Sequence, residues 1–244
     1  MHQSTTSPYA LSAEQVTQYH RDGYVIVPDL ISPADAIAWK EAMIARLTEE
    51  GKLHEPSGVR VWMCDRMDSL TATHIQSPKT VAILQQLIGP AVEFLSYKAV
   101  FKNGQTTFNS PWHQDWWYWR GSNKLSIWIA LDDATEENGC LRLVPGSHRQ
   151  VFTERQIDDG KGFGHRLTDE DMAGMTIVTA PVPRGGAVFF PDLTLHGSCP
   201  NINGQDRWSV IPTYRNATQS DTSTVWKQSL LIRQQSPTLS NHPM

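Results

Sequence analysis

The chain has 244 residues, 39% of them hydrophobic and 19% charged, with a net charge of −4 and an isoelectric point near 6.1. Together with 15 prolines and 16 glycines, this composition fits a compact, loop-rich domain better than a disordered chain or a helical bundle. No run of basic residues is present, so nucleic acid and anionic membrane surfaces are not expected partners. We expect a small-molecule ligand and either a monomer or a homodimer.

The first 90 residues predict helices with a short strand between them. Ser12, with a glutamine three residues later, forms a capping box and predicts a helix to about residue 22. Residues 24–27 are mostly β-branched and predict a strand, and Pro33 stands where a second helix would begin. A third helix is expected over about 78–87. Four apolar residues fit one face of the second helix: Ile37, Met43, Ile44 and Leu47.

From about residue 92 the sequence changes to short strands separated by turn residues. These strands are expected over 92–101, 125–131, 140–144, 187–190 and 208–214. The pattern predicts a sandwich or closed roll that forms one domain over 11–234, with mobile polar tails at 1–10 and 235–244. A long insertion over about 150–175 is typical of a functional or disordered loop, and we consider a lid there.

The location of the protein is expected to be the cytoplasm. Cys64, Cys140 and Cys199 share no close metal-binding spacing, and this odd, low count predicts no disulfide framework. The N-terminus lacks a cationic segment followed by an apolar stretch, so no secretion signal is expected. No apolar run approaches the roughly 20 residues needed to cross a bilayer.

The most informative pattern is His113 and Asp115, followed far downstream by His196. Two residues that are two positions apart on a β-strand project from the same face. Together the three residues form a set of two histidines and one carboxylate, which binds Fe(II) on one side and leaves other coordination positions open. The alternative is an aromatic core strand with one hydrogen-bonded His–Asp pair. A third ligand and an arginine in suitable order favour the metal.

Arg207 is the candidate anchor for a carboxylate co-substrate, because it follows the distal histidine and precedes an apolar strand. A buried guanidinium needs a partner, and its planar fork matches a carboxylate. The alternative is a salt bridge with an internal acid. Ser198 and Ser209 are candidate hydroxyl donors beside it. Among the other histidines, His148 is the most serious rival ligand, but its position in a turn after a strand favours a structural or substrate-facing role.

An ordered set of short phrases resembles the phytanoyl-CoA dioxygenase family of Fe(II)/2-oxoglutarate oxygenases. The phrases are 19–24, 112–115, 128–134, 137–141 leading into 145–148, and 196–198 with Arg207. The resemblance covers about residues 12–216. It implies a mainly β fold with flanking α-helices, namely a cupin-like double-stranded β-helix (jelly roll) with added N-terminal helices.

The resemblance also implies the cofactors and their ligands. His113, Asp115 and His196 would hold the iron, and Arg207 would bind the distal carboxylate of 2-oxoglutarate, with O₂ as the second co-substrate. Ser198 and Trp128 fall where the family lines the co-substrate. Lys98 or Lys102 is expected to approach the same pocket, and Ser209 is the further candidate there from its hydroxyl group. No separate acid or base is expected, because the iron centre carries the chemistry. Related halogenating enzymes have a small residue in place of the carboxylate, so Asp115 favours oxygenation over halogenation.

The implied reaction is hydroxylation of an unactivated C–H bond of a small metabolite, such as a natural-product intermediate, with release of succinate and CO₂. Desaturation, cyclisation or epoxidation would use the same cofactors. An alternative from another class is a metal-free jelly-roll binding module.

The substrate-binding residues are expected next to the iron ligands. If the strand stays regular after Asp115, Trp117 and Trp119 face the metal, and their rings suit an apolar substrate or a cation. The alternative is that these rings fill the interior of the roll. Three more candidates lie in a segment where the family contributes to the substrate mouth: Arg60, Trp62 and Met63.

Overall fold

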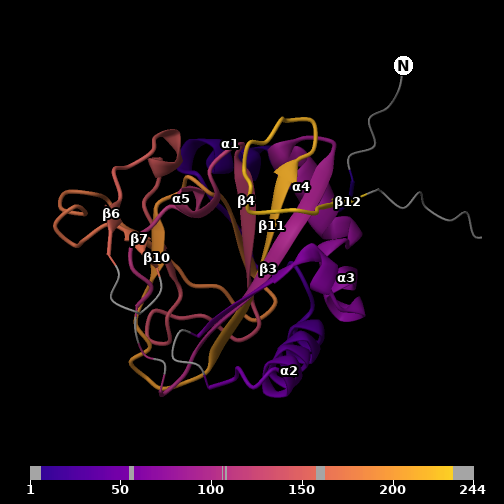
Figure 1. Ribbon diagram of the computed structural model, residues 1–244, viewed down its shortest axis with the longest axis horizontal. Coiled ribbons are helices and arrows are strands. Elements are labelled where there is room, and N and C mark those ends of the chain that lie inside the picture. Colours follow the sequence, from indigo (N-terminus) through magenta and orange to yellow (C-terminus); the bar gives the residue numbers. More distant parts are fainter. Residues whose placement is uncertain (1–6, 55–57, 106, 108, 158–162, 233–244) are drawn as a thin grey trace, which may run out of the picture.

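The structure, a computed structural model, shows two antiparallel sheets that pack face to face, with helices on the outer side of the larger sheet (Figure 1). The described residues are 7–54, 58–105, 107, 109–157 and 163–232. The prediction of a mainly β roll with N-terminal helices is confirmed by this arrangement. Of the predicted tails, residues 1–6 and 233–244 lie outside the described residues, and the domain limits stay a prediction.

Four helices of seven or more residues precede the β region, and sequence predicted three of them. They are α1 (Ala13–Asp22), α2 (Pro33–Glu49), α3 (Ser69–Ile75) and α4 (Pro78–Ile88). Each begins after a polar residue whose side chain accepts a hydrogen bond from a backbone N–H of the first turn. Helix α1 ends at Gly23, which adopts a left-handed φ of 79° that glycine tolerates without strain. None of the described helices is long and apolar enough to span a membrane.

The buried face of α2 differs in part from the predicted one. Ile37 is 42% exposed, so its assignment to the buried face was wrong. The face that packs on the sheet is formed by Ala36, Trp39, Met43 and Leu47. Trp39 was missed although it fits the helical period, and its indole N–H donates to Thr71 of α3.

The larger sheet has the order β1-β9-β4-β11-β3, and β2 and β12 pair with different parts of the free edge of β3. Its strands are β1 (Val25–Val27), β2 (Val59–Met63), β3 (Val92–Lys102), β4 (Lys124–Ala130), β9 (Ala187–Pro191), β11 (Arg207–Asn216) and β12 (Leu230–Ile232). Figure 1 shows α2, α3 and α4 on one side of this sheet. The long central strands agree with the predicted ranges to within about two residues.

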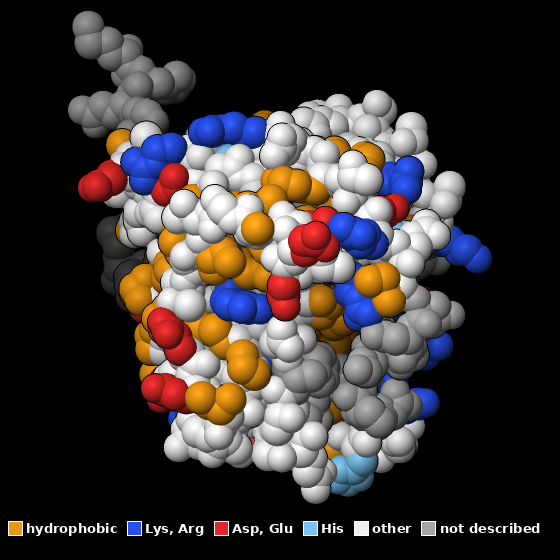
Figure 2. All heavy atoms as spheres, turned by 90° about the vertical axis from the view of Figure 1, so that its left-hand side faces the viewer, with side chains coloured by type: hydrophobic (Ala, Val, Ile, Leu, Met, Phe, Trp, Pro, Cys, Tyr) orange, Lys and Arg blue, Asp and Glu red, His pale blue; other side chains and the backbone are white. Residues whose placement is uncertain are grey.

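The smaller sheet has the order β10-β5-β8 and faces the inner side of the larger one. Its strands are β10 (His196–Ser198), β5 (Leu141–Leu143) and β8 (Val178–Ala180). The predicted insertion contains a short hairpin, β6 (Arg155–Gln156) and β7 (His165–Arg166). The short helical segments are η1 (Cys64–Arg66), α5 (Trp116–Trp119) and η2 (Ser147–Arg149). Figure 2 views the molecule from the side that lies on the left in Figure 1, where hydrophobic side chains gather between isolated charged groups.

Alternation along β11 divides its side chains between two cores and thereby positions the site. Trp208, Val210 and Tyr214 lie in the core under the helices. Ile211 lies in the core between the sheets, and Arg207 lines the same cavity as Ile211. Because successive residues of a strand face opposite sides, the inner face of β11 points its polar residues towards the smaller sheet.

Candidate metal centre

The two histidines of the predicted ligand set face each other across an antiparallel backbone pair. The N–H of His113 donates to the carbonyl of His196 at 2.9 Å, and the N–H of His196 donates back at 3.0 Å. This reciprocal pair fixes the residues directly opposite each other, with ring centroids 4.2 Å apart. Gly197 permits the close approach, because a Cβ there would lie 2.8 Å from the carbonyl oxygen of Ser110.

The remaining ring nitrogens and one carboxylate converge. Nδ1 of His113 donates to the carbonyl of Pro111 at 2.8 Å, and Nδ1 of His196 donates to the carbonyl of Thr194 at 2.9 Å. These bonds place the proton on Nδ1 of each ring and leave Nε2 with a free lone pair. Ligand atoms of His113, Asp115 and His196 all lie within 4.8 Å of one another. The donor set therefore fits a divalent metal that accepts two imidazoles and a carboxylate.

The electrostatics suit metal binding. Burial lowers the pKa of His113 to about 3, and the neighbouring His196 adds to this effect. Burial also lowers the pKa of His196. For Asp115, burial would raise the pKa, but Lys98 and the two histidines outweigh it, so the pKa is lowered. At pH 7 the imidazoles are thus neutral and the carboxylate is ionised, which are the forms that bind a metal.

The expectation that the strand continues after Asp115 is wrong. Asp115 has helical angles (φ −59°, ψ −30°), and α5 follows directly. Trp117 therefore does not face the ligands and is buried in a separate hydrophobic cluster with Trp112. Trp119 does line a cavity beside the ligands, and Tyr118 of the same helical turn lines it too.

Gln114, between the two predicted ligands, points away from them and fastens this turn. Its amide nitrogen donates to the carbonyls of Gln150 and Leu193, and its side-chain oxygen accepts from the N–H of Phe152. Gln114 is fully buried, so its hydrogen bonds hold the ligand segment without direct contact with the metal site. Its place between two same-face residues was the only sequence signal for this role.

Arg207 lines a cavity of about 70 Å³ together with all three predicted ligands. The residue is 1% exposed, and burial lowers its pKa to about 10. Its NH1 donates to the carbonyl of Val100 and to Oγ of Ser209. Among the described residues it forms no ion pair, and its Nε has no hydrogen-bond partner. A buried cation with an unused donor, next to a cavity, fits an anionic carboxylate ligand.

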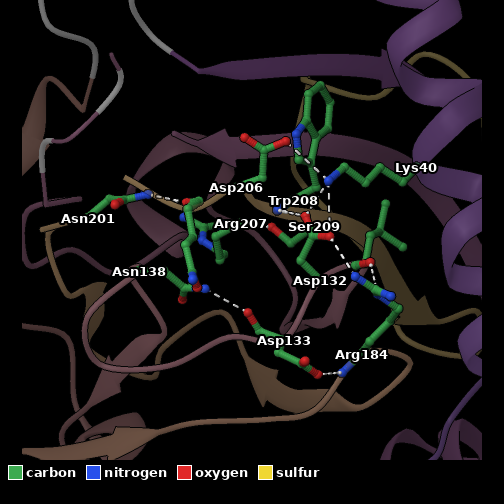
Figure 3. Close-up of polar contacts among 12 residues, drawn as sticks. Lys40, Asp132, Asp133, Asn138, Arg184, Asn201, Asp206, Arg207, Trp208 and Ser209 are labelled. Carbon is green, nitrogen blue, oxygen red and sulfur yellow. Dashed lines mark hydrogen bonds and ion pairs between the residues drawn. The ribbon is translucent and has the colours of Figure 1, made fainter. Parts of the chain in front are cut away.

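A charged cluster outside the cavity fixes the start of β11 (Figure 3). Asp132 accepts hydrogen bonds from Lys40 of α2 at 2.8 Å, from Arg184 at 3.2 Å and from the backbone N–H of Trp208 at 3.1 Å. Since Trp208 follows Arg207, this cluster ties the position of the guanidinium to the helix layer. Sequence patterns pointed to Asp132 only as part of the family phrase 128–134.

The other predicted co-substrate residues are arranged around Arg207. Trp128 lies under its guanidinium, with the ring centroid 5.3 Å from the central carbon. Ser198, Trp128 and Lys98 line the same cavity, whereas Ser209 lies behind Arg207 and donates to the carbonyl of Val100. Lys98 forms an ion pair with Asp115 at 3.5 Å.

A second cavity, of about 290 Å³, adjoins the ligands. Of the three candidates on β2, Met63 lines it and the other two do not. Trp62 is buried on the opposite side of the strand, where it stacks on Tyr97, and Arg60 shares that side by alternation. Sequence reasoning missed two residues of this cavity that come from the C-terminal segment, Val225 and Trp226.

The predicted insertion packs against the site through two residues. Leu167 pairs with Trp112, and Phe163 contacts the ring of His113 with centroids 4.9 Å apart. Residues 158–162 lie outside the described residues, and a lid stays a prediction. The rival His148 contacts the carbonyl of His20 in α1 and takes no part in the ligand cluster.

Comparison with known proteins identifies the family to which this chain belongs. The model of the phytanoyl-CoA dioxygenase family matches residues 19–209. The chain belongs to the phytanoyl-CoA dioxygenase family. Curated relatives include L-proline trans-4-hydroxylase of Streptomyces griseoviridis, 28% identical over 90% of this chain and 92% of that protein. Ectoine dioxygenase of Bordetella parapertussis is 28% identical over 85% of this chain and 76% of its own length.

Solved structures of similar fold include the carbocyclase SnoK from nogalamycin biosynthesis, described as non-heme and α-ketoglutarate dependent. It superposes with a TM-score of 0.72 and 23% identity, over 91% of this chain and 97% of SnoK. EctD of S. alaskensis superposes with a TM-score of 0.69 and 22% identity, over 89% of this chain and 80% of EctD. The predictions of the phytanoyl-CoA dioxygenase family, the cupin-like fold and an iron- and 2-oxoglutarate-dependent dioxygenase are confirmed.

Proposed function

We propose that this family member hydroxylates an unactivated C–H bond of a small metabolite, with iron held by His113, Asp115 and His196. Arg207 binds the distal carboxylate of 2-oxoglutarate. The observation that carries the proposal is the convergence of three metal-type donors within 4.8 Å, beside a buried guanidinium that lacks an ion pair among the described residues. Relatives named as a proline hydroxylase and ectoine dioxygenases support hydroxylation of a small molecule.

When bound, iron with 2-oxoglutarate and O₂ supplies the oxidising power, and 2-oxoglutarate is converted into succinate and CO₂. The protein's own residues bind and orient these groups. The carbonyls of Pro111 and Thr194 hold the two imidazoles in one tautomer and one orientation. The guanidinium of Arg207, held by Ser209, presents its unused donor edge to the co-substrate. Burial of this site excludes water and strengthens each polar contact.

Desaturation, cyclisation and epoxidation remain alternative outcomes of the same site, because the placement of the substrate decides them. The neighbour SnoK is named a carbocyclase, but its likeness to this chain concerns the fold. The further alternative, a metal-free binding module, is disfavoured by membership of a dioxygenase family. We retain a cytoplasmic location, supported by three free cysteines, and a monomer or homodimer as proposals.

The test is 2-oxoglutarate turnover by the purified protein with Fe(II) under air. We expect succinate from the wild type and a loss of at least a hundredfold in His113→Ala, together with loss of bound metal. The matched control is His148→Ala, because this half-buried histidine lies outside the ligand cluster and should leave both readouts unchanged. Wild-type protein that neither binds iron nor forms succinate would refute the proposal.

A further inference from the structure

The second cavity carries information about the substrate, because it opens directly onto His113 and Asp115. Eight of its twelve lining residues are hydrophobic, and they come from β2, α5, the predicted insertion and the C-terminal segment. Its volume of about 290 Å³ lies near the small end of the range, about 300–1,000 Å³, that is typical of ligand pockets. The cavity is therefore suited to a compact molecule placed next to the metal ligands.

Exposed hydrophobic side chains concentrate at this cavity. Ten large hydrophobic residues in the described part of the chain are exposed, and four of them line it: Val61, Met63, Tyr118 and Val225. Burial of such side chains is favourable, so a cluster of exposed ones marks a surface that a ligand covers. No other described cavity brings so many of these residues together.

The aromatic residues of the cavity use their polar atoms elsewhere. The indole N–H of Trp119 donates to Asp192 at 2.7 Å, and that of Trp226 donates to Ser96 at 3.2 Å. The hydroxyl of Tyr118 donates to the carbonyl of His165 at 3.1 Å. An indole has a single donor, so both tryptophans offer the cavity only apolar ring surface.

Charge in the lining is already paired. Lys98 forms its ion pair with Asp115 and lies over the ring of Trp119, 5.2 Å from the centroid. The site over that ring is thus taken by a cation, which disfavours a second cation there. Ser96 already accepts the bond from Trp226. Within the described lining, the cavity offers an ionic substrate group no unpaired partner of opposite charge.

The wall formed by Trp226 is held in place. Its ring lies 5.0 Å from that of Trp119 at an interplanar angle of 51°. The segment before it is fastened by Asp221, which accepts from Lys124 at 2.9 Å and pairs with Arg215 at 3.1 Å. The two indoles therefore form a fixed aromatic corner.

From this lining we infer that the substrate is a neutral, ring-bearing hydrophobic molecule, and that Trp119 and Trp226 are its specificity-determining contacts. The inference rests on the proposed function, since it places this molecule where the oxidising centre acts. A neutral substrate would distinguish this chain from the relatives named for proline and ectoine, because those two molecules carry one positive and one negative group each. Among the described lining residues, the Lys98 ammonium and the Ser96 hydroxyl can donate a hydrogen bond to a carbonyl or hydroxyl group of the substrate.

The test uses three probes that share one ring system and differ in charge: 2-naphthylmethanol, 2-naphthylmethylammonium and 2-naphthoate. Their affinities are measured by calorimetry without oxygen, with Mn(II) and saturating 2-oxoglutarate bound to the full-length protein. We expect the neutral alcohol to bind at least tenfold more tightly than either ion, and more tightly than L-proline or ectoine. Tighter binding of an ion, L-proline or ectoine overturns the inference.

Two pairs of variants test whether 2-naphthylmethanol binds in this cavity. Trp226→Ala should weaken 2-naphthylmethanol binding about tenfold, whereas Trp226→Phe should stay within threefold of the wild type. Val61→Asp, at a position 49% exposed, should also weaken it at least tenfold, while Val151→Asp, 51% exposed outside the cavity, should not. If Trp226→Ala does not fold, Val61→Asp still decides. Unchanged affinity in Val61→Asp overturns the inference.

Succinate release by the wild type without a probe tests the proposed function separately. Succinate formed by a protein that ignores the neutral probe would leave the function standing and refute the substrate class. Binding of the neutral probe by a protein that forms no succinate would do the reverse.

Discussion

Replacing Arg207 with methionine should weaken the binding of 2-oxoglutarate and at the same time stabilise the ligand-free protein. Burial lowers the pKa of this guanidinium from 12.5 to about 10, so the fold disfavours its charged form. At pH 7 the guanidinium is charged in both the folded and unfolded states, so the whole free-energy cost of burying its charge lowers the stability of the folded state. A difference of roughly 2.5 in pKa corresponds to about 3 kcal/mol.

The substitution also removes two hydrogen bonds, to Val100 and Ser209, which together stabilise the fold by roughly 2 kcal/mol. Neither partner is left unpaired, because the Ser209 hydroxyl donates to the Val100 carbonyl. We therefore expect Arg207→Met to raise the free energy of unfolding by about 1 kcal/mol, which is about 2–4 °C in Tm for a chain of this size. Thermal unfolding without ligand measures it.

The affinity should change in the opposite direction. Two charge-assisted hydrogen bonds to a carboxylate are each worth about 1.5–3 kcal/mol, so their loss weakens binding by roughly 10²- to 10⁴-fold. The assay is calorimetric titration of 2-oxoglutarate with Mn(II) bound. The exposed, ion-paired Arg21 gives the control Arg21→Met, which should change neither quantity. Wild-type affinity for 2-oxoglutarate in Arg207→Met would refute the anchoring role, and a fall in Tm would refute the burial argument.

Three further substitutions test the supports of the site. Gly197→Ala should weaken metal binding about tenfold or more in a metal titration, because its Cβ would press on the carbonyl of Ser110; unchanged affinity contradicts this. Burial raises the pKa of Asp192 to about 7, so the folded state favours the protonated carboxyl group. The stability that this group contributes is present below pH 4 and is lost as the pH rises to 7. In urea unfolding, Asp192→Asn should match the wild type at pH 4 and exceed it by up to about 4 kcal/mol at pH 8; parallel pH curves would count against this. Asp132→Ala should lower the free energy of unfolding by about 3 kcal/mol, because it leaves the buried N–H of Trp208 unpaired, and Asp132→Asn by clearly less; equal losses would disprove the role of that bond.

The sequence was most predictive where function restricts the pattern. His113 and Asp115 were paired by their spacing and His196 by its order in the family phrases, and the structure brings all three together. The helix starts were also predictable, because capping depends on neighbouring residues. Local rules were sufficient for these elements.

Local rules failed where distant contacts decide. The four aromatic residues after Asp115 favour a strand, yet they form a helical turn. The turn is held by Asp192, whose carboxylate accepts from the indole N–H of Trp119 and whose backbone carbonyl accepts from the backbone N–H of Trp116. The side of β2 that faces the cavity depends on its register with β3, which the sequence of β2 alone does not specify. Trp226 reaches the cavity through tertiary contacts, namely those of Asp221 and its own contacts with Ser96 and Trp119, which no local sequence pattern specifies.

The fastened C-terminal segment has a consequence for how the chain can vary. The family match ends at residue 209, whereas Val225 and Trp226 follow it. The donors His113, Asp115 and His196 all precede that end. The three metal-type donors and one wall of the second cavity are thus encoded in separate parts of the chain, and Asp221 connects them through its contacts with Lys124 and Arg215. Exchange of residues 217–229 between relatives would therefore change one wall of this cavity while His113, Asp115 and His196 stay untouched.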